Sequence, residues 1–148
     1  MGYGMDLDWN LLRTRAREAM QRAYAPYSRF PVGAAGWDGR QLSVGCNVEN
    51  VSYGVGLCAE CVLVGNNRVA DGGRLLAVSV CDSRGEVLLP CGRCRQVLYE
   101  FGGKNLLVDH ADGPVPLGHL LADAFGPDDL TAGQTAGIPG RSHPLPPV

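Results

Sequence analysis

Residues 58–94 read CAECVLVGNNRVADGGRLLAVSVCDSRGEVLLPCGRC, and they carry the strongest signals for the fold. A helix is predicted from about Cys58 to about Ala70, because Asp71-Gly72-Gly73 is a strong stop signal. The aliphatic and small residues from Leu75 to Cys81 follow and predict a buried strand. Pro90 then precedes a second helix, predicted at 91–101. The stretch therefore predicts a helix, a buried strand and another helix in succession.

The chain on both sides of this stretch continues the alternation. The pattern predicts a helix from Leu12 to Ala23 that Asp8 caps, and a hairpin whose turn is Asp38-Gly39. Further strands are predicted at 32–37, 41–46, 86–89 and 106–109, and a short helix at 117–124. Strands that alternate with helices favour an α/β sandwich around a mostly buried sheet.

The composition is that of an ordinary globular protein with one domain. The chain has 148 residues, of which 45% are hydrophobic and 19% charged, and its net charge is -2. A protein that binds nucleic acid through its phosphates usually has a basic stripe, and the sequence shows none. A small-molecule substrate is therefore favoured over a polynucleotide. No apolar run reaches the roughly 20 residues that a membrane helix needs.

The two ends of the chain limit the predicted domain to residues 8–130. Residues 1–8 have neither the basic cluster nor the apolar run of a signal peptide, so we expect a cytoplasmic protein with reduced cysteines. Residues 131–148 are rich in glycine and proline and cannot bury a core, which predicts a disordered tail.

Four of the six cysteines form two pairs, Cys58-x-x-Cys61 and Cys91-x-x-Cys94. Two such pairs are typical of a structural zinc site in which all four sulfurs bind the metal, and on the pairs alone that interpretation stays open. Glu60, inside the first pair, argues against it, since a structural site has no use for a carboxylate beside its ligands. The interval between the pairs also exceeds the about 15–20 residues of small zinc modules.

The order of residues around the pairs instead indicates a catalytic zinc site. Cys58-Ala59-Glu60, followed by Pro90-Cys91-Gly92-Arg93-Cys94, matches the signature of zinc-dependent nucleobase deaminases. Cys58, Cys91 and Cys94 would hold one Zn²⁺ and leave its fourth position for water. Zinc would activate that water to attack C4 of a cytosine ring. Glu60 would carry protons to N3 and to the amine, which leaves as ammonia.

With these residues in place, the sequence resembles the homotetrameric zinc-dependent cytidine deaminases over residues 12–130. The resemblance also rests on residues 25–34 (APYSRFPVGA), 45–50 (GCNVEN), 52–54 (SYG), 94–98 (CRQVL) and 125–130 (FGPDDL). It implies a three-layer α/β/α sandwich with a mixed, roughly five-stranded sheet. It further implies hydrolytic deamination of cytidine and deoxycytidine to uridine and deoxyuridine in pyrimidine salvage, with one zinc ion per subunit.

The same resemblance implies a set of substrate contacts. Asn47 and Glu49 are expected to hydrogen-bond the ribose, mainly its 3′-hydroxyl, which both donates and accepts. Phe30 is expected to pack on the pyrimidine. Ala59 is expected to contribute backbone contacts, and Glu60 to read the base edge as well as carry protons.

Two aromatic residues connect the expected site to assembly. Tyr53 and Phe125 are similar to family residues that enter or line the active site of a neighbouring subunit. The resemblance therefore implies a homotetramer with shared active sites, which acts on a small nucleoside and has neither a nucleic-acid polymer nor a membrane as partner.

Two alternatives stay open beside this hypothesis. The first is a deaminase of another aminopyrimidine nucleoside, such as blasticidin S, and the second is the non-catalytic four-cysteine zinc module. Cys61 departs from many members of the family, which carry at this place an arginine that hydrogen-bonds the thiolate ligands. Arg93 is a candidate to offset the negative charge of three thiolates instead.

Overall fold

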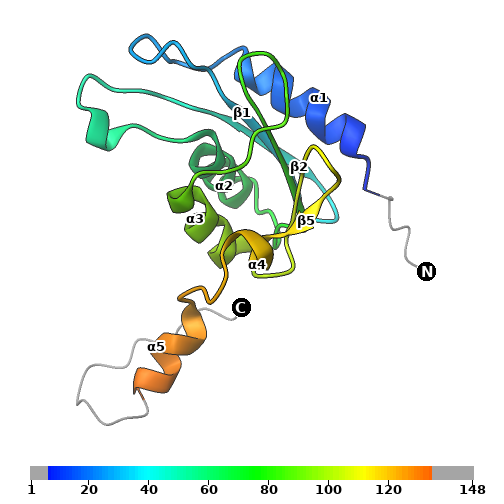
Figure 1. Cartoon of the computed structure of the whole chain (residues 1–148), viewed down its shortest axis with the longest axis vertical. Helices are drawn as coiled ribbons and strands as arrows, with labels where there is room; N and C mark the ends of the chain where they lie inside the picture. The colour runs from blue at the N-terminus through cyan, green and yellow to red at the C-terminus, as the bar shows by residue number, and fades with distance from the viewer. Residues whose placement is uncertain (1–6, 135–148) are drawn as a thin grey trace.

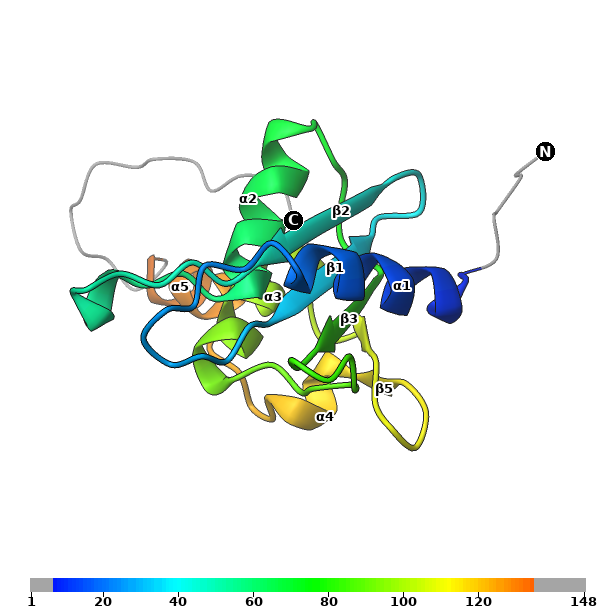
Figure 2. The ribbon, with the colours of Figure 1, turned by 90° about the horizontal axis from the view of Figure 1, so that it is seen from above.

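The computed structural model describes residues 7–134 and shows a sheet with helices on both faces (Figure 1). In chain order the elements are α1 (Trp9–Met20), β1 (Gly33–Trp37), β2 (Leu42–Cys46), the 3₁₀ helix η1 (Tyr53–Val55), α2 (Ala59–Val69), β3 (Ala77–Cys81), α3 (Gly92–Gly102), β4 (Leu107–Val108), β5 (Val115–Pro116), α4 (Leu117–Leu120) and α5 (Pro127–Gln134). The strand order is β2-β1-β3-β4-β5, and Figure 2 shows β2, β1, β3 and β5 in this order from above. Only β3 and β4 pair in parallel, so the sheet is mixed.

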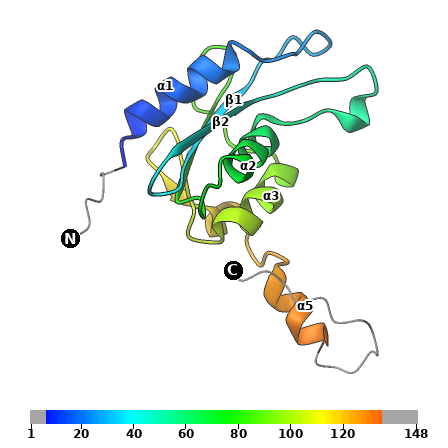
Figure 3. The same cartoon turned by 180° about the vertical axis from the view of Figure 1, so that it is seen from behind.

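The helices form two outer layers, with α1 on one face of the sheet and α2 and α3 on the other (Figure 3). Alternate residues of β1 point to the two layers. Ala35 packs with Leu12 of α1, whereas Ala34 packs with Leu63 of α2. This arrangement confirms the three-layer α/β/α sandwich. None of the helices within residues 7–134 has the length and apolar character needed to span a membrane.

The α1 helix begins where the sequence predicts, at Asp8. The Asp8 carboxylate accepts hydrogen bonds from the backbone N–H groups of Asn10 (2.9 Å) and Leu11 (3.1 Å), which have no partner inside the helix. Arg13 donates two hydrogen bonds of 2.8 Å to the buried carboxylate of Asp109, which follows β4. The cap and the ion pair together fix α1 on the sheet.

Two glycines allow the helices to approach the sheet closely. A Cβ atom at Gly33 would clash with the carbonyl oxygen of Ala16, and one at Gly45 would clash with the carbonyl oxygen of Ala59 and the amide nitrogen of Leu63. These neighbours are helix backbone and cannot rotate away, so only glycine fits. Gly45 therefore sets how closely the start of α2 lies against β2.

Residues 86–89 do not form the predicted strand. They contribute only an isolated bridge between Cys81 and Val87 to the edge of β3. The Asp82 carboxylate accepts hydrogen bonds from two following backbone N–H groups and draws the chain into a turn, and Pro90, which has no N–H, ends the pairing. The fifth strand of the sheet is β5, which the sequence pattern did not predict.

The elements after β5 also differ from the prediction. The α4 helix ends at Leu120 rather than at 124, and a further helix, α5, extends past residue 130 to Gln134. Acidic residues Asp128 and Asp129 occupy the first turn of α5, where the helix dipole favours negative charge. Residues 135–148, which make up the rest of the predicted tail, lie outside the described residues.

Replacing Gly45 with alanine should disturb the start of α2. The added methyl group meets helix backbone, so we expect the free energy of unfolding to fall by about 1–3 kcal/mol, as at other overpacked sites. Urea unfolding followed by circular dichroism measures this loss. Gly65→Ala is the matched control, because a Cβ atom there meets nothing within 4 Å and alanine suits a helix interior. Equal stability of the two variants would contradict the close contact between β2 and α2.

Candidate metal centre and substrate cavity

Three cysteine side chains come together where two helices begin. Cys58 is the N-cap of α2, Cys91 is the N-cap of α3, and Cys94 lies in the first turn of α3. Their sulfur atoms all lie within 4.8 Å of one another. The positive ends of both helix dipoles are therefore close to the sulfur atoms, which favours thiolates over thiols.

The fourth cysteine of the two pairs, Cys61, does not belong to this cluster. Among residues 7–134, the group of side chains able to share one metal ion contains Cys58, Cys91 and Cys94, and Cys61 lies further along α2, partly exposed. All six cysteines are unpaired. The geometry therefore favours three sulfur ligands with an open fourth position over the four-cysteine module.

A buried carboxylate lies next to the sulfur atoms. Glu60, in the first turn of α2, is 4% exposed, and its Oε2 accepts a hydrogen bond of 3.4 Å from the sulfur of Cys94. Burial raises the pKa of Glu60 and outweighs the hydrogen bonds that lower it. Burial and the nearby charge of Glu60 also raise the pKa of the Cys94 thiol.

This set of donor atoms fits a zinc ion. Three thiols and a carboxyl group share one cluster, where desolvation and mutual repulsion oppose their joint ionisation. A divalent cation held by Cys58, Cys91 and Cys94 would remove that penalty, and thiolate sulfur is a preferred zinc ligand. The carboxylate of Glu60 is not part of the group that could share the metal ion.

A cavity of about 590 Å³ opens beside the thiols and Glu60. Its wall comes from the segment before β1, the loop between β2 and α2, and the segment between β3 and α3. Most residues predicted for the site line it, and they are Phe30, Asn47, Glu49, Tyr53, Cys58, Ala59, Glu60 and Cys91. Cys94, fully buried, lies behind Glu60, and Phe125 is not among the wall residues.

Several apolar residues of the wall were not predicted. They are Val32, Val48, Leu57, Leu88 and Leu89. The pair Leu88-Leu89 stands directly before Pro90 and Cys91 of the cysteine cluster, and this adjacency is a signal that could have identified it. Arg93, the candidate for offsetting the thiolate charge, also lies in the wall and is exposed.

Asn47 lies in the cavity wall and also binds the backbone of the segment before β1. Its Oδ1 accepts a hydrogen bond from the N–H of Val32 (2.8 Å), and its Nδ2 donates to the carbonyl of Phe30 (2.9 Å). A single amide therefore holds the chain on both sides of Pro31.

Glu49 makes a similar contact a few residues earlier in the same segment. Its Oε1 accepts hydrogen bonds from the backbone N–H groups of Tyr27 and Ser28, both at 3.0 Å. Hydrogen bonds from the hydroxyl and the N–H of Ser28 lower the pKa of Glu49. The carboxylate is therefore charged at neutral pH.

The two aromatic residues expected to reach a neighbouring subunit are both exposed. Tyr53 is 80% exposed and belongs to η1, at the tip of a loop that extends from the body in Figure 2. Phe125 is 61% exposed and lies just before α5, where its carbonyl accepts a hydrogen bond of 2.9 Å from Gln96 of α3. The structure brings Tyr53 to the cavity wall and leaves Phe125 away from it.

Arg95 holds the beginning of α3 in place. Its Nε donates to the carbonyl of Pro90 and its Nη1 donates to the carbonyl of Leu120, both at 2.8 Å. The residue before Cys91 is thereby tied to the end of α4. These contacts give Arg95 a structural role.

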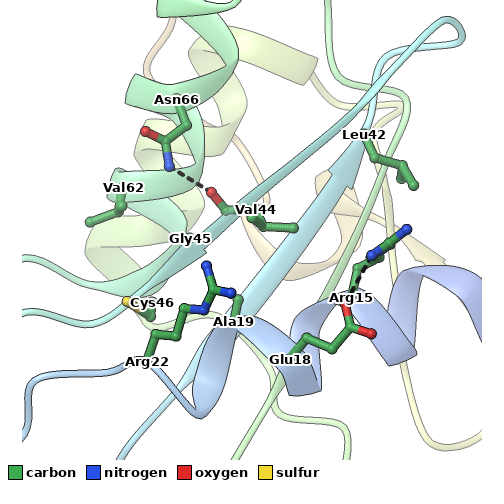
Figure 4. A pocket seen from close by; sticks show the side chains of 10 residues that line it. All are labelled: Arg15, Glu18, Ala19, Arg22, Leu42, Val44, Gly45, Cys46, Val62 and Asn66. Atoms are coloured by element: carbon green, nitrogen blue, oxygen red, sulfur yellow. Dashed lines mark hydrogen bonds and ion pairs between the residues drawn. The ribbon is translucent and has the colours of Figure 1, made fainter.

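A second cavity, of about 530 Å³, lies along β2 between α1 and α2 (Figure 4). It is lined by Arg15, Glu18, Ala19, Arg22, Leu42, Val44, Gly45, Cys46, Val62 and Asn66. Arg15 and Glu18 pair with each other at 3.0 Å, and the amide of Asn66 donates to the carbonyl of Val44 at 2.8 Å. None of the residues predicted for the site lines this cavity, so the candidate chemistry belongs to the first one.

The cluster makes a direct prediction about zinc content. Cys91→Ala should lower zinc well below one ion per chain, because two sulfur ligands do not complete the site. Cys61→Ala, the matched control, should keep one ion per chain. Atomic absorption after dialysis measures both, with circular dichroism to check folding. Full zinc in Cys91→Ala would remove it from the ligands, and loss of zinc in Cys61→Ala would favour the four-cysteine module.

Comparison with known sequences places this site in a family. Residues 8–109 match the family model of the cytidine and deoxycytidylate deaminase zinc-binding region. A cytidine deaminase of Mycobacterium tuberculosis (strain H37Rv) is 60% identical over 127 residues, which cover 84% of this chain and 95% of that protein. A cytidine deaminase of Sporosarcina psychrophila is 39% identical over 135 residues, which cover 84% of this chain and 96% of that protein.

Solved structures extend the similarity to the fold. The crystal structure of cytidine deaminase from Mycobacterium tuberculosis matches with a TM-score of 0.80 and 58% identity, covering 82% of this chain and 99% of that one. The enzyme of that name from Mycobacterium leprae matches with a TM-score of 0.77 and 46% identity, covering 80% of this chain and 100% of that one. With a matching zinc-binding region, a shared fold and high identity over most of its length, the chain belongs to the zinc-dependent cytidine and deoxycytidylate deaminase family.

Proposed function

We propose that this chain catalyses the hydrolytic deamination of cytidine and deoxycytidine to uridine and deoxyuridine, a reaction of pyrimidine salvage. The observation that carries the proposal is a buried glutamate, Glu60, beside three converging thiols in the wall of one cavity. A volume of about 590 Å³ suits a small ligand. Relatives that share 60% and 39% identity with the chain bear the name cytidine deaminase, which supports the choice of substrate.

Glu60 carries the protons in the proposed reaction. Zinc bound at the three cysteines supplies a Lewis acid that makes water a nucleophile near neutral pH. Glu60 takes a proton from the attacking water and gives it to N3 of the cytosine ring. The water oxygen forms the new bond at C4. Glu60 then takes the second proton, from the hydroxyl now on C4, and delivers it to the 4-amino group, so that the C4–N bond breaks, the C4 carbonyl forms and ammonia leaves.

The environment of Glu60 suits this task. A proton carrier needs an appreciable proton affinity at the working pH, and burial raises the pKa of Glu60 above the ordinary value of a carboxyl group. Burial, with only 4% of the residue exposed, confines the carboxylate beside the sulfur cluster. The side chain is therefore fixed in place while its proton affinity is high.

The cavity wall has a base side and a sugar side in this proposal. Phe30, 46% exposed, offers a ring face to the pyrimidine, and the backbone of Ala59 meets the base edge. Asn47 and Glu49 bind the 3′-hydroxyl, because an amide with a carboxylate serves both its donor and its acceptor. Both retain capacity for this contact, since an amide has a second N–H and a carboxylate a second oxygen.

Glu60→Gln should keep the fold and the zinc but lower kcat by a factor of about 10²–10⁴ or more, because an amide cannot carry protons. A spectrophotometric assay with cytidine measures the loss. Glu100→Gln, exposed on α3, is the matched control and should keep the parent rate. A rate for Glu60→Gln within a few-fold of the parent would exclude proton transfer by Glu60. Turnover of blasticidin S, with none of cytidine or deoxycytidine, would contradict the proposed substrate.

We further propose a homotetramer with active sites shared between subunits. Three apolar residues of the loop around η1 are largely exposed, with Val51 at 76%, Tyr53 at 80% and Val55 at 62%. An exposed apolar patch of this kind marks a contact with another protein. Phe125 is also exposed, and Gln96 fixes its backbone, so it is available to the cavity of a neighbouring subunit.

Phe125→Ala should raise KM for cytidine about 2- to 10-fold with little change in kcat, since the variant loses an aromatic contact worth about 0.5–1.5 kcal/mol. Val69→Ala, at an exposed apolar residue near the end of α2, is the control and should keep the parent KM. Light scattering on the parent should give the mass of a tetramer. An active monomer would contradict the shared site.

The compartment is part of the same proposal. All six cysteines are unpaired, and three of them are proposed as zinc ligands, which requires reducing conditions. We therefore propose a cytoplasmic location.

A further inference from the structure

Phe30 belongs to a segment that lies outside the sheet and that contacts the core cluster through Val32. Residues 25–32 form turns and irregular chain between α1 and β1, and the backbone of Arg29 has a positive φ of 57°. Phe30 itself is 46% exposed, so packing against the core does not fix its ring. The position of this part of the cavity wall must therefore depend on polar contacts.

Those contacts come from the two residues expected to bind the sugar. Asn47 connects to Phe30 and Val32, and Glu49 connects to Tyr27 and Ser28, with all four hydrogen bonds between 2.8 and 3.0 Å. Each bond ends on the backbone of the segment rather than on a side chain. The segment is thereby fixed at two points, on either side of Arg29.

The side chain of Asn47 takes the place of the backbone of a neighbouring strand as hydrogen-bonding partner. Pro31 has no N–H and cannot pair with a neighbouring strand, so the chain around it lacks a regular partner. The Asn47 side chain supplies both an acceptor, for the Val32 N–H, and a donor, for the Phe30 carbonyl. Its backbone N–H also donates to the Val32 carbonyl at 3.2 Å. Phe30 is therefore fixed through its own carbonyl.

We propose that Asn47 and Glu49 are positioning residues for Phe30, in addition to any contact they make with the sugar. The inference rests on the proposed function, because it concerns the wall of the same cavity. Its consequence is specific: removing the Asn47 amide weakens the binding of nucleosides that have no 3′-hydroxyl at all. A residue that acted only through that hydroxyl would leave the binding of such nucleosides unchanged.

The test is a double-mutant cycle read with a ligand that lacks the 3′-hydroxyl. The inhibition constant of 2′,3′-dideoxycytidine, competing with deoxycytidine, is measured for the parent, Asn47→Ala, Phe30→Ala and the double variant. We expect Asn47→Ala to raise this constant about ten-fold in the parent background, as loss of two hydrogen bonds allows. In the Phe30→Ala background the same change should raise it about two-fold or less, because the ring it positions is gone.

Matched variants separate positioning from general damage. Asn50→Ala removes the same side chain nearby, where Oδ1 accepts from the N–H of Ser52 and does not reach the 27–32 segment, so it should keep the parent constants. Glu49→Gln keeps a side-chain oxygen for the two N–H groups, and Glu49→Ala does not. The glutamine variant should therefore bind the dideoxy ligand within about two-fold of the parent, and the alanine variant several-fold more weakly. If Asn47→Ala fails to fold, the comparison of Glu49→Gln with Glu49→Ala still tests the inference.

Each remaining outcome overturns the inference. An unchanged constant in Asn47→Ala means that Asn47 acts only through the hydroxyl, and an equal effect in both Phe30 backgrounds means that it does not act through the ring. If the parent turns over deoxycytidine but does not bind the dideoxy ligand, then Phe30 does not bind the base without the 3′-hydroxyl contact. Failure of the proposed function looks different, because the parent then turns over neither cytidine nor deoxycytidine.

Discussion

The N-termini of α2 and α3 lie next to each other, and the other elements of the fold hold them in this position. Cys58 comes from one helix and Cys91 and Cys94 from the other, and their sulfurs have to lie within reach of a single ion. The sheet supplies the platform on which two separate helices can be held at that distance. Gly45 lets α2 lie close to β2, and Arg95 ties the start of α3 to α4. The substrate cavity is the space in front of these two helix starts.

The electrostatics of the site follow from the same arrangement. Two helix N-termini bring partial positive charge to a cluster that would otherwise gather negative charge from three sulfurs and a carboxylate. Cys61 contributes no charge of opposite sign, and it stays outside the cluster. Arg93 is the cationic side chain in the cavity wall beside Cys91. The fold itself therefore provides part of the compensation that an arginine next to the catalytic glutamate gives in many members of the family.

The metal cluster could be predicted from the sequence because its spacing is local. Cys91 and Cys94 lie three residues apart at the start of one helix, which places them on one face, and Cys58-Ala59-Glu60 and Pro90-Cys91-Gly92-Arg93-Cys94 are short motifs that can be recognised without knowing the fold. The cap at Asp8 and the buried strand β3 were predictable for the same reason, since a few adjacent residues carry the signal.

Elements that depend on distant partners could not be predicted in this way. The two residues of β5 have no periodicity to detect, and only their pairing with β4 makes them a strand. Residues 87–89 form an apolar run, and such a run looks the same whether it pairs in a sheet or lines a cavity, as Leu88 and Leu89 do. The hydrogen bonds from Asn47 to the segment before β1 join residues far apart in the chain, so no local sequence pattern predicts them.

β2 is an edge strand of the sheet, and its outer edge bears on aggregation at high protein concentration. An edge strand presents unpaired backbone groups that can template pairing with a foreign strand, the first step toward fibrils. Here the amide of Asn66 already occupies the carbonyl of Val44, and α2 packs against the same strand. A second chain therefore finds one carbonyl of this edge already taken by a side chain, on a strand whose face is covered by a helix. Pairing of a foreign strand along β2 has to displace Asn66 first, which disfavours open-ended growth of the sheet at this edge.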